Sequence, residues 1–189
     1  MNERTGFMAH VPPDVQLAKT VRLSAEIADA YGGSLCLVNG DVLRPYIIYN
    51  LPEEYIAGCA EIRVGSQCCG RAVEAKKPWI VTDMLHDPLF AGGRKGAENS
   101  LVRAAFSVPV FQGDSVIASL ACHYAAPRTP SALDIERNEH FARLIAIILT
   151  SHRIDTAGAP IFVRPSDHYS GGDLTFSVGL SSGSTSLSS

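Results

Sequence analysis

The side chains best suited to chemistry in this chain of 189 residues are its five cysteines, at positions 36, 59, 68, 69 and 122. Two of them are adjacent, in the stretch Gly65-Ser66-Gln67-Cys68-Cys69-Gly70, and a short helix is expected directly afterwards, over residues 71–75. A helix start presents unpaired N–H groups and the positive end of the helix dipole, which lower the pKa of a thiol directed at it. Cys68 or Cys69 is therefore a candidate thiolate.

The glycines of the same stretch allow two interpretations. Because glycine has no Cβ, the backbone at Gly65 and Gly70 can approach a ligand closely. The adjoining helix start would then favour an anion or a carbonyl oxygen. Alternatively, the two glycines only form a tight turn.

The spacing of the cysteines argues against cross-links and metal centres. An odd number without repeated spacing is untypical of a disulfide framework, so reduced thiols are expected. Cys36 and Cys122 lie in strand-like segments and are expected to be small buried side chains. No C-x-x-C pair exists, and neighbours such as Cys68 and Cys69 point in different directions, so a metal or iron–sulfur site is not expected.

Three further kinds of side chain could contribute to a site. His123 follows Cys122 on an expected strand, where a neutral imidazole either hydrogen-bonds a ligand or is satisfied within the core. Arg94, Lys95 and Arg103 either neutralise an anionic ligand or form a solvated basic cluster. The aromatic side chains that form either pocket walls or core are Tyr46, Trp79, Phe90 and Phe106.

The spacing of apolar residues indicates alternating helices and hairpins. Asp14 can cap a first helix, which Tyr31-Gly32-Gly33 ends. Strands over 34–38 and 42–49 are joined across Asn39-Gly40-Asp41, a strong hairpin signal. The other expected elements are a short helix over 51–57, a strand over 79–82, a second hairpin over 103–111 and 115–124, and a helix capped by Ser131 that runs to about His152.

Residues 83–101 form a long loop between two of these strands. A loop of this length in a compact domain is either disordered or covers a site. The apolar Leu89 and Phe90 beside Asp87-Pro88 favour a lid over a site.

Four short motifs follow one another in this frame: Gly65 to Gly70, Pro78-Trp79-Ile80-Val81-Thr82-Asp83, Asp87-Pro88, and Ser107-Val108-Pro109-Val110. This succession resembles a GAF domain, and the resemblance runs from about Ala18 to His152. It implies an α/β (α+β) fold with a central antiparallel sheet, terminal helices on one face and a ligand pocket on the other. It also implies a sensory module, without naming a ligand or a cofactor.

The resemblance and the helix start together predict a pocket for a small anionic or polar ligand. The ligand-binding residues predicted for it are Cys68, Cys69, Gly70, Phe90, Arg94, Phe106, Ser107 and His123. An alternative is a free methionine-R-sulfoxide reductase, which is also a GAF domain. The reactive cysteine of those enzymes would fall at Asn99-Ser100-Leu101-Val102, where this chain has none.

Composition narrows the other functional classes. The net charge of −3 and the pI near 6.0 argue against a nucleic-acid partner. No apolar run approaches the ~20 residues that span a bilayer, and no signal core follows Met1, so a cytoplasmic protein without membrane contact is expected. Kinase, cyclase and helix-turn-helix motifs are absent, so the output partner is expected to be a separate histidine kinase or cyclase, or another part of a larger protein. The start at Met1 favours a stand-alone receptor of the kind that includes the nitrate receptor of a two-component system.

The ends of the chain complete the predicted organisation. Residues 1–13 are expected to be disordered, residues 14–153 to form the GAF domain, and the Ser/Gly-rich residues 154–189 to be a flexible tail. The terminal helices carry two apolar stripes each, which predicts a homodimer through a shared helix bundle. The residues predicted for that bundle are Leu17, Val21, Phe141, Leu144 and Ile148.

Overall fold

The computed structural model describes residues 11–152 and 159–166. The elements in chain order are α1 (Pro13–Ile27), β1 (Gly32–Asn39), β2 (Val42–Tyr49), α2 (Glu53–Ala57), β3 (Ile62–Arg63), α3 (Gln67–Ala75), β4 (Trp79–Val81), the 3-10 helix η1 (Pro88–Gly93), α4 (Arg94–Glu98), β5 (Ala104–Gln112), β6 (Ser115–Tyr124), α5 (Ala132–Ser151) and β7 (Ile161–Val163).

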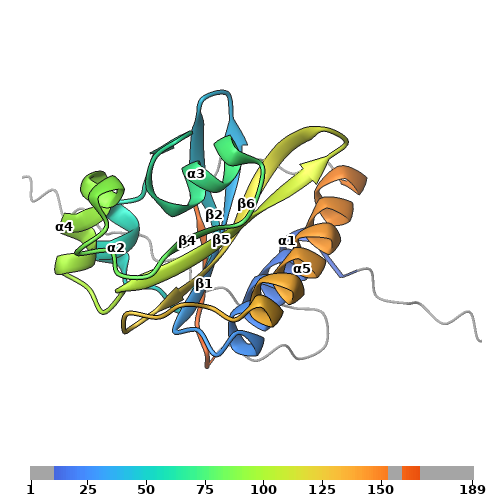
Figure 1. The fold of residues 1–189 in the computed structure, drawn as a ribbon. Coiled ribbons are helices and arrows are strands. Elements are labelled where there is room, and N and C mark those ends of the chain that lie inside the picture. Colours follow the sequence, from blue (N-terminus) through green and yellow to red (C-terminus); the bar gives the residue numbers. More distant parts are fainter. Residues whose placement is uncertain (1–10, 153–158, 167–189) are drawn as a thin grey trace, which may run out of the picture.

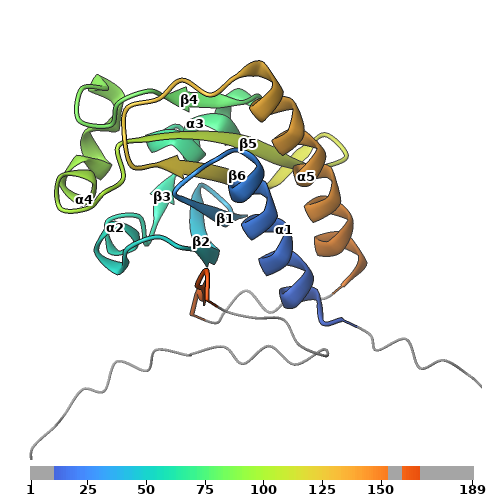
Figure 2. The same ribbon diagram turned by 90° about the horizontal axis from the view of Figure 1, so that it is seen from below.

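A single curled sheet organises these elements. Its strands follow the order β3-β2-β1-β6-β5-β4, with antiparallel neighbours throughout, and β7 adds to β2 in parallel. Figures 1 and 2 show α1 and α5 side by side on one face of the sheet and α3 on the other. The helices α2 and α4 lie together at one end of the α3 side.

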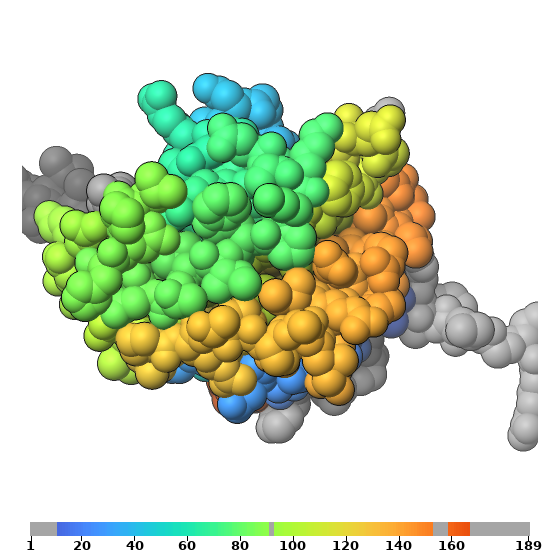
Figure 3. All heavy atoms as spheres, viewed as in Figure 1, coloured from blue at the N-terminus to red at the C-terminus, as the bar shows by residue number. Residues whose placement is uncertain are grey.

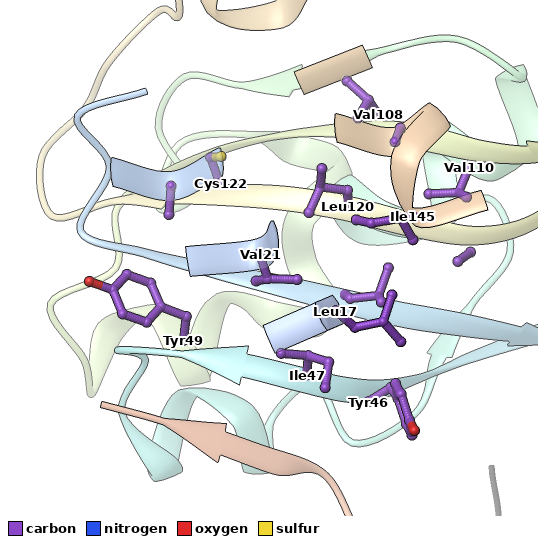
Figure 4. Packing of buried hydrophobic residues seen from close by; sticks show 14 of the residues in the cluster. Leu17, Val21, Tyr46, Ile47, Tyr49, Val108, Val110, Leu120, Cys122 and Ile145 are labelled. Carbon is purple, nitrogen blue, oxygen red and sulfur yellow. The ribbon is translucent and has the colours of Figure 1, made fainter. Parts of the chain in front are cut away.

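The larger core lies between the sheet and the helix pair α1 and α5 (Figure 4). Leu17 and Val21 of α1 stand at helical spacing and are fully buried, as is Ile145 of α5. Their partners come from alternate positions of the central strands, among them Val108 and Leu120. Such alternation is expected of strands covered on both faces, because successive side chains point to opposite sides.

The opposite face of the sheet carries a second core under α3 and the α2–α4 end. Alternation along β5 assigns Phe106 to the α5 side and Ala105 to the α3 side. Ser107 and His123 therefore face α3, while Cys122 joins the core under the helix pair. The sheet thus separates two environments, and the α3 side contains most of the polar groups predicted for the site.

The predicted fold is confirmed in its main features: an antiparallel sheet, the terminal helices on one face, and α3 with residues 83–101 on the other. Asn39 pairs with Val42, so Gly40 and Asp41 make a two-residue hairpin turn. Gly40 has a φ of 63°, which glycine adopts without strain. Ser131 caps α5 through a reciprocal capping box with Asp134.

Three features of the backbone differ from expectation. The helix after the glycine turn begins at Gln67 and not at residue 71, and the two-residue strand β3 precedes it. The expectation of a free tail after residue 154 is wrong for β7, because Ile161 pairs with Ile47 and Val163 is buried against the core. The predicted disordered residues 1–10 and the Ser/Gly-rich residues 167–189 lie outside the described residues.

The residues predicted for a shared helix bundle differ in exposure. Leu17, Val21 and Ile148 are buried inside the domain, and Phe141 is partly buried against the same core. Leu144 remains about half exposed. The other large apolar side chains exposed on α1 and α5 are Leu23, Ile27, Leu133 and Ile147.

In the part of the chain that the structure describes, every helix is too short or too polar to cross a membrane.

Candidate functional site

A narrow cavity lies between the α3 face of the sheet and the helices α2, α3 and η1. Its lining residues are Ser34, Cys36, Pro45, Ile48, Tyr55, Ile56, Cys59, Ile62, Gln67, Cys68, Cys69, Phe90 and His123. The volume open to a water-sized sphere is about 20 Å³, enough for roughly one water molecule. We call it the thiol-lined cavity, because four of the five cysteines reach it.

A chain of polar groups forms one wall of this cavity. The Nε2 of His123 lies 3.0 Å from the hydroxyl of Ser34, and its Nδ1 lies 3.3 Å from the hydroxyl of Tyr55. The Tyr55 ring meets the imidazole edge-on, with ring centroids 5.4 Å apart. Burial lowers the pKa of His123 to about 4, so the imidazole is neutral at physiological pH and can both donate and accept a hydrogen bond.

Thiols and hydroxyls gather on the α3 face of the sheet. Cys36 and Cys69 both line the cavity. The hydroxyls of Ser107 on β5 and Ser119 on β6 are hydrogen-bonded to each other.

The pKa of Cys69 is lowered, unlike that of the other cavity thiols. The neighbouring Cys36 thiol has the largest effect on it, burial acts in the opposite direction, and the Ser107 and Ser119 hydroxyls lower it further. The neighbouring Cys69, followed by burial, raises the pKa of Cys36 well above its ordinary value. The sequence predicted a thiolate at Cys68 or Cys69, and of these two the pKa of Cys69 is lowered while that of Cys68 is raised.

The two other cavity thiols are inert by comparison. Burial raises the pKa of Cys68 well above that of an ordinary thiol, and its Sγ lies 3.5 Å from the carbonyl oxygen of Trp79. Burial raises the pKa of Cys59 to about 12, and its Sγ lies 3.4 Å from the side-chain oxygen of Gln67. Among the described residues, no group of His, Cys, Asp and Glu side chains is arranged to hold a metal ion.

Residues 83–101 close the cavity at one end, as the lid interpretation predicted. Phe90 is almost fully buried and lines the cavity, whereas the adjacent Leu89 is exposed. Arg71 of α3 anchors the lid, because its guanidinium lies 3.4 Å from the carboxylate of Asp87. The same guanidinium lies over the ring of Trp79, 5.2 Å from the ring centroid. Arg71 is itself buried, so this ion pair is largely shielded from solvent.

A second set of ion pairs anchors the base of the lid. Asp83 accepts hydrogen bonds from Arg103, at 3.1 Å, and lies 2.7 Å from the Nδ1 of His86. The hydrogen bond from His86, followed by that from Arg103, lowers the pKa of the Asp83 carboxyl. The two arginines expected to attract an anion therefore bond to lid residues. Arg103 binds the carboxylate of Asp83, and Arg94, itself part of the lid, donates to the backbone oxygen of Asp87.

The eight predicted ligand-binding residues separate into three groups. Cys68, Cys69, Phe90 and His123 line the cavity, whereas Ser107 lies on the α3 face of the sheet, where it hydrogen-bonds to Ser119, and does not line the cavity. The remaining three are Gly70, Arg94 and Phe106, and none of them reaches it.

Each of the three displaced residues has a physical reason for its position. Phe106 faces α5 and stacks on Tyr124, because one step along β5 reverses the direction of a side chain. A Cβ on Gly70 would lie 2.1 Å from the carbonyl oxygen of Arg63, so this glycine permits α3 to pack against β3. Arg94 points its guanidinium at the lid backbone. Gly70 therefore lies inside α3, where it permits close packing, and not in the tight turn considered from the sequence.

Nine of the thirteen lining residues were not among the predicted ligand-binding residues. Four of the nine are Cys36, predicted as simple core, Cys59, Tyr55 and Gln67. Alternation along the first hairpin would have placed Cys36 on the same face as Ser34, but which face is which depends on the position of α3. No local pattern marks Tyr55 or Cys59, because they reach the site through the packing of α2.

The charge of the lining bears on ligand class. Among the described residues that line the cavity, none is Lys, Arg, Asp or Glu. The polar groups are the imidazole, a phenol, a hydroxyl, an amide and thiols. They suit a neutral ligand that donates and accepts hydrogen bonds better than an anion.

A wider hollow of about 450 Å³ lies on the outside of the domain, where α5 meets the corner before β4 (Figure 3). It is lined by Lys76, Lys77, Pro78, Pro109, Phe111, Glu139, Ala142, Arg143, Ala146 and Ile147. Its side chains are mostly long and solvent-facing, and it lacks the buried, mutually hydrogen-bonded groups of the thiol-lined cavity. We therefore take the cavity as the candidate site.

The sheet is covered by the terminal helices on one face and carries a small cavity on the other, which defines an α+β module. Residues 12–149 match the GAF domain, and the chain belongs to this family. Membership in it supports a regulatory, sensory role. No curated protein sequence matches the chain.

Solved structures with this fold have diverse functions. The chain is similar to the free methionine-R-sulfoxide reductase of Neisseria meningitidis, with a TM-score of 0.62 and 19% identity over 75% of this chain and 80% of that one. It is similar to the GAF domain of a phosphoenolpyruvate-protein phosphotransferase of Coxiella burnetii, with a TM-score of 0.63 and 13% identity over 74% and 83% of the two chains. A domain of a protein described as a two-component sensor histidine kinase of Sinorhizobium meliloti gives 0.59 and 13% over 70% and 87%. At these identities the similarity concerns the fold.

Proposed function

We propose that this GAF domain is a sensory module of bacterial signal transduction that binds a small polar molecule in the thiol-lined cavity. One observation carries the proposal: the buried hydrogen-bonded groups of His123, Ser34 and Tyr55 converge on an enclosed apolar space. Few precisely placed polar groups in an apolar enclosure are typical of small-molecule sites. The uncharged lining supports a neutral polar ligand over the anion expected from the sequence.

Ligand entry requires movement of the covering elements, because the free volume accommodates only about one water molecule. The movable part is α2 with the lid. Tyr55 of α2 touches His123 through one hydrogen bond and one ring contact, and Phe90 of the lid fills the space beside them. A ligand that replaces Tyr55 on His123 would enlarge the cavity by displacing α2.

The strand β6 offers a path from the cavity to the terminal helices. His123 faces the cavity, while the preceding Cys122 faces the helices and lies 3.4 Å from the side-chain oxygen of Asn138 on α5. The Cys122 thiol also lies 3.8 Å from the backbone oxygen of Ser24 on α1. A shift of β6 caused by ligand binding at His123 would therefore change the buried contacts of Cys122 with both helices.

The output proposed for these helices is a homodimer that acts on a histidine kinase or a cyclase. Leu23 and Ile27 of α1, and Leu144 and Ile147 of α5, are large apolar side chains left exposed on neighbouring helices. Exposed apolar groups of this kind gather at protein contacts. Sedimentation of the wild type and of Leu144→Glu tests the dimer, and a wild type that stays monomeric at high micromolar concentration contradicts it.

A thermal-shift screen of small neutral polar molecules tests the binding function. A ligand at 100 times its dissociation constant stabilises the domain by about 2.7 kcal/mol. The stabilisation should vanish in His123→Leu and persist in Arg143→Ala, which alters only the wider hollow on the outside of the domain. The opposite result, stabilisation lost in Arg143→Ala and kept in His123→Leu, would indicate that the ligand binds in that hollow. A screen without any hit would contradict the sensory proposal.

A second candidate is methionine sulfoxide reduction. The observation in its favour is the gathering of four thiols around one cavity in a fold shared with such reductases. Its test is turnover of free methionine-R-sulfoxide with thioredoxin as reductant. Turnover abolished by Cys69→Ser would select the enzyme, whereas no turnover would leave the binding function as the account of the cavity.

A further inference from the structure

We propose that Gln67 selects the ligand of the thiol-lined cavity and that this ligand is a small aliphatic carboxamide. The side chain of Gln67 lines the cavity, and its amide matches a carboxamide group donor for acceptor. The inference rests on the proposed function, because it concerns the same cavity. It goes further in naming the chemical class of the ligand and the residue that recognises it.

The backbone of Gln67 has a conformation that residues with a side chain do not favour. Gln67 is the first residue of α3 and has a φ of 52°, in the left-handed region that residues other than glycine rarely adopt. Among the described residues, Asp29, Asn50 and Lys76 also have a positive φ without being glycine. Those three are at least partly exposed, whereas Gln67 is buried. Strained backbone that is held by its surroundings is concentrated at functional sites.

The main chain of Gln67 is fixed by the residue that also anchors the lid. The Nε of Arg71 donates to the backbone oxygen of Gln67 at 2.6 Å, and the same guanidinium lies 3.4 Å from the carboxylate of Asp87 in the lid. The lid backbone also comes close to the amide, because a Cβ on Gly93 would lie only 3.2 Å from the Cδ of Gln67. The amide is therefore held between α3 and the lid at the edge of the cavity.

The side chain of Gln67 has hydrogen-bonding capacity that the domain does not use. Its Oε1 accepts one hydrogen bond, from the Cys59 thiol at 3.4 Å, and keeps a second lone pair. Its Nε2 carries two protons, and none of the described residues accepts a hydrogen bond from it. Gln67 is only 8% exposed, and a buried donor without an acceptor costs stability. A ligand acceptor in the cavity would remove this cost.

A carboxamide group complements the free positions of Gln67. Its carbonyl oxygen can accept a hydrogen bond from Nε2 while its N–H donates to Oε1, and it keeps a further N–H and a further lone pair for His123. The aliphatic part of the ligand suits the apolar part of the lining, which includes Ile48, Ile56 and Ile62. A carboxylate of the same shape would bring a charge into a cavity whose described lining contains neither Lys nor Arg.

The test compares four molecules of nearly the same size and shape: acetamide, acetone, acetate and acetamidinium. Acetone has a methyl group in place of the amide nitrogen, acetate is an anion, and acetamidinium is a cation that only donates hydrogen bonds. Each is titrated into the ¹⁵N-labelled full chain, and chemical shifts of backbone amides in α3 and β6 are followed by NMR. We expect acetamide to saturate these shifts, with the other three binding at least about tenfold more weakly.

Two substitutions of Gln67 separate recognition from packing. Gln67→Glu should shift the preference from acetamide to acetamidinium, because a carboxylate accepts hydrogen bonds from both nitrogens of the cation. Gln67→Gly removes the side chain, and because glycine adopts a φ of 52° without strain, this variant should fold even if Gln67→Glu does not. It should bind acetamide no more tightly than acetone. The control is Gln112→Glu, exposed at the end of β5, which should keep the wild-type order.

Two results would overturn the carboxamide proposal and leave the proposed binding function in place. One is a wild type that binds acetone or acetate in the cavity as tightly as acetamide, and the other is a preference for acetamide that survives in Gln67→Gly. Unchanged α3 and β6 shifts with all four molecules would also overturn it. Failure of the binding function itself is recognised separately, by the absence of any hit in the wider thermal-shift screen.

Discussion

The hydroxyl of Tyr55 on α2 lies 3.3 Å from the Nδ1 of His123 on β6, and their rings meet edge-on. This contact joins a short helix of five residues to the centre of the sheet. The same contact bounds the thiol-lined cavity. The imidazole that is proposed to bind a ligand therefore also holds α2, which covers the cavity, in place.

Removal of the Tyr55 hydroxyl should loosen this cover. We expect Tyr55→Phe to cost about 1 kcal/mol of stability and to speed amide hydrogen exchange in α2. The matched control is Tyr124→Phe, which removes a buried hydroxyl bond of the same 3.3 Å length on the α5 side. Its loss of stability should be similar, with α2 exchange unchanged. Equal α2 exchange in both variants would show that Tyr55 does not hold the cover.

The depressed pKa of His123 should make stability depend on pH. Burial lowers this pKa from 6.5 to about 4. Between these values the unfolded chain binds a proton that the folded chain does not, so the free energy of unfolding should rise as pH rises from 4 to 6.5. The full difference is about 3 kcal/mol and is lost again on acidification through the same window.

Urea unfolding at several pH values measures this effect. His123→Gln should remove most of the slope between pH 4 and 6.5, whereas His140→Gln, exposed on α5, should keep it. The groups facing His123 are the Tyr55 phenol and the cavity thiols, and burial raises the pKa of Tyr55 well above its ordinary value, so the phenol does not titrate in this window. A slope unchanged in His123→Gln would contradict a neutral buried imidazole.

The ion pair between Arg71 and Asp87 should control the lid. Their side chains are only 5% and 18% exposed, and removal of one partner from a buried pair costs about 3 kcal/mol. We expect Arg71→Gln to lose stability on this scale and to accelerate hydrogen exchange over residues 83–101. Arg44→Gln breaks an ion pair with both side chains more than half exposed and should cost about 0.5 kcal/mol or less. Equal effects of the two variants would rule out Arg71 as the anchor.

Two glycines on the α3 side should respond oppositely to substitution. In Gly70→Ala the new Cβ would meet the Arg63 carbonyl oxygen at 2.1 Å, so we expect a loss of about 3 kcal/mol or more. In Gly96→Ala, within α4, the atom nearest the new Cβ would be the backbone oxygen of Tyr55 on α2 at 3.6 Å, an ordinary van der Waals contact. That variant should be neutral or gain up to about 1 kcal/mol. Thermal unfolding measures the stability of both variants. If Gly70→Ala is as stable as the wild type, close packing does not explain this glycine, and a role in ligand contact becomes the better explanation.

Local signals were sufficient for most of the fold. The Asn39-Gly40-Asp41 turn, the Ser131 cap and the motif succession from Gly65 to Val110 each act over a few residues, and each is found in the structure. The parallel strand β7 was not predicted because its three residues pair with β2, which is distant in the sequence, so no local turn or hairpin signal indicates the partner.

The site was harder to predict than the fold because its members are joined by packing. His123 and Cys69 were found from their neighbours in the chain, but Cys36 and Tyr55 reach the cavity only once α2 and α3 are placed on the sheet. Phe106 was assigned to the wrong face, since the two faces of a strand buried on both sides are not distinguished by a regular alternation of apolar and polar residues.

Hydrogen–deuterium exchange of the full chain with a ligand from the thermal-shift screen tests the sensory account most directly. We predict slower exchange in α3 and β6 around the thiol-lined cavity, together with altered exchange in α1 and α5, and loss of both changes in His123→Leu. Protection confined to α5 and the corner before β4, unchanged in His123→Leu, would contradict the account.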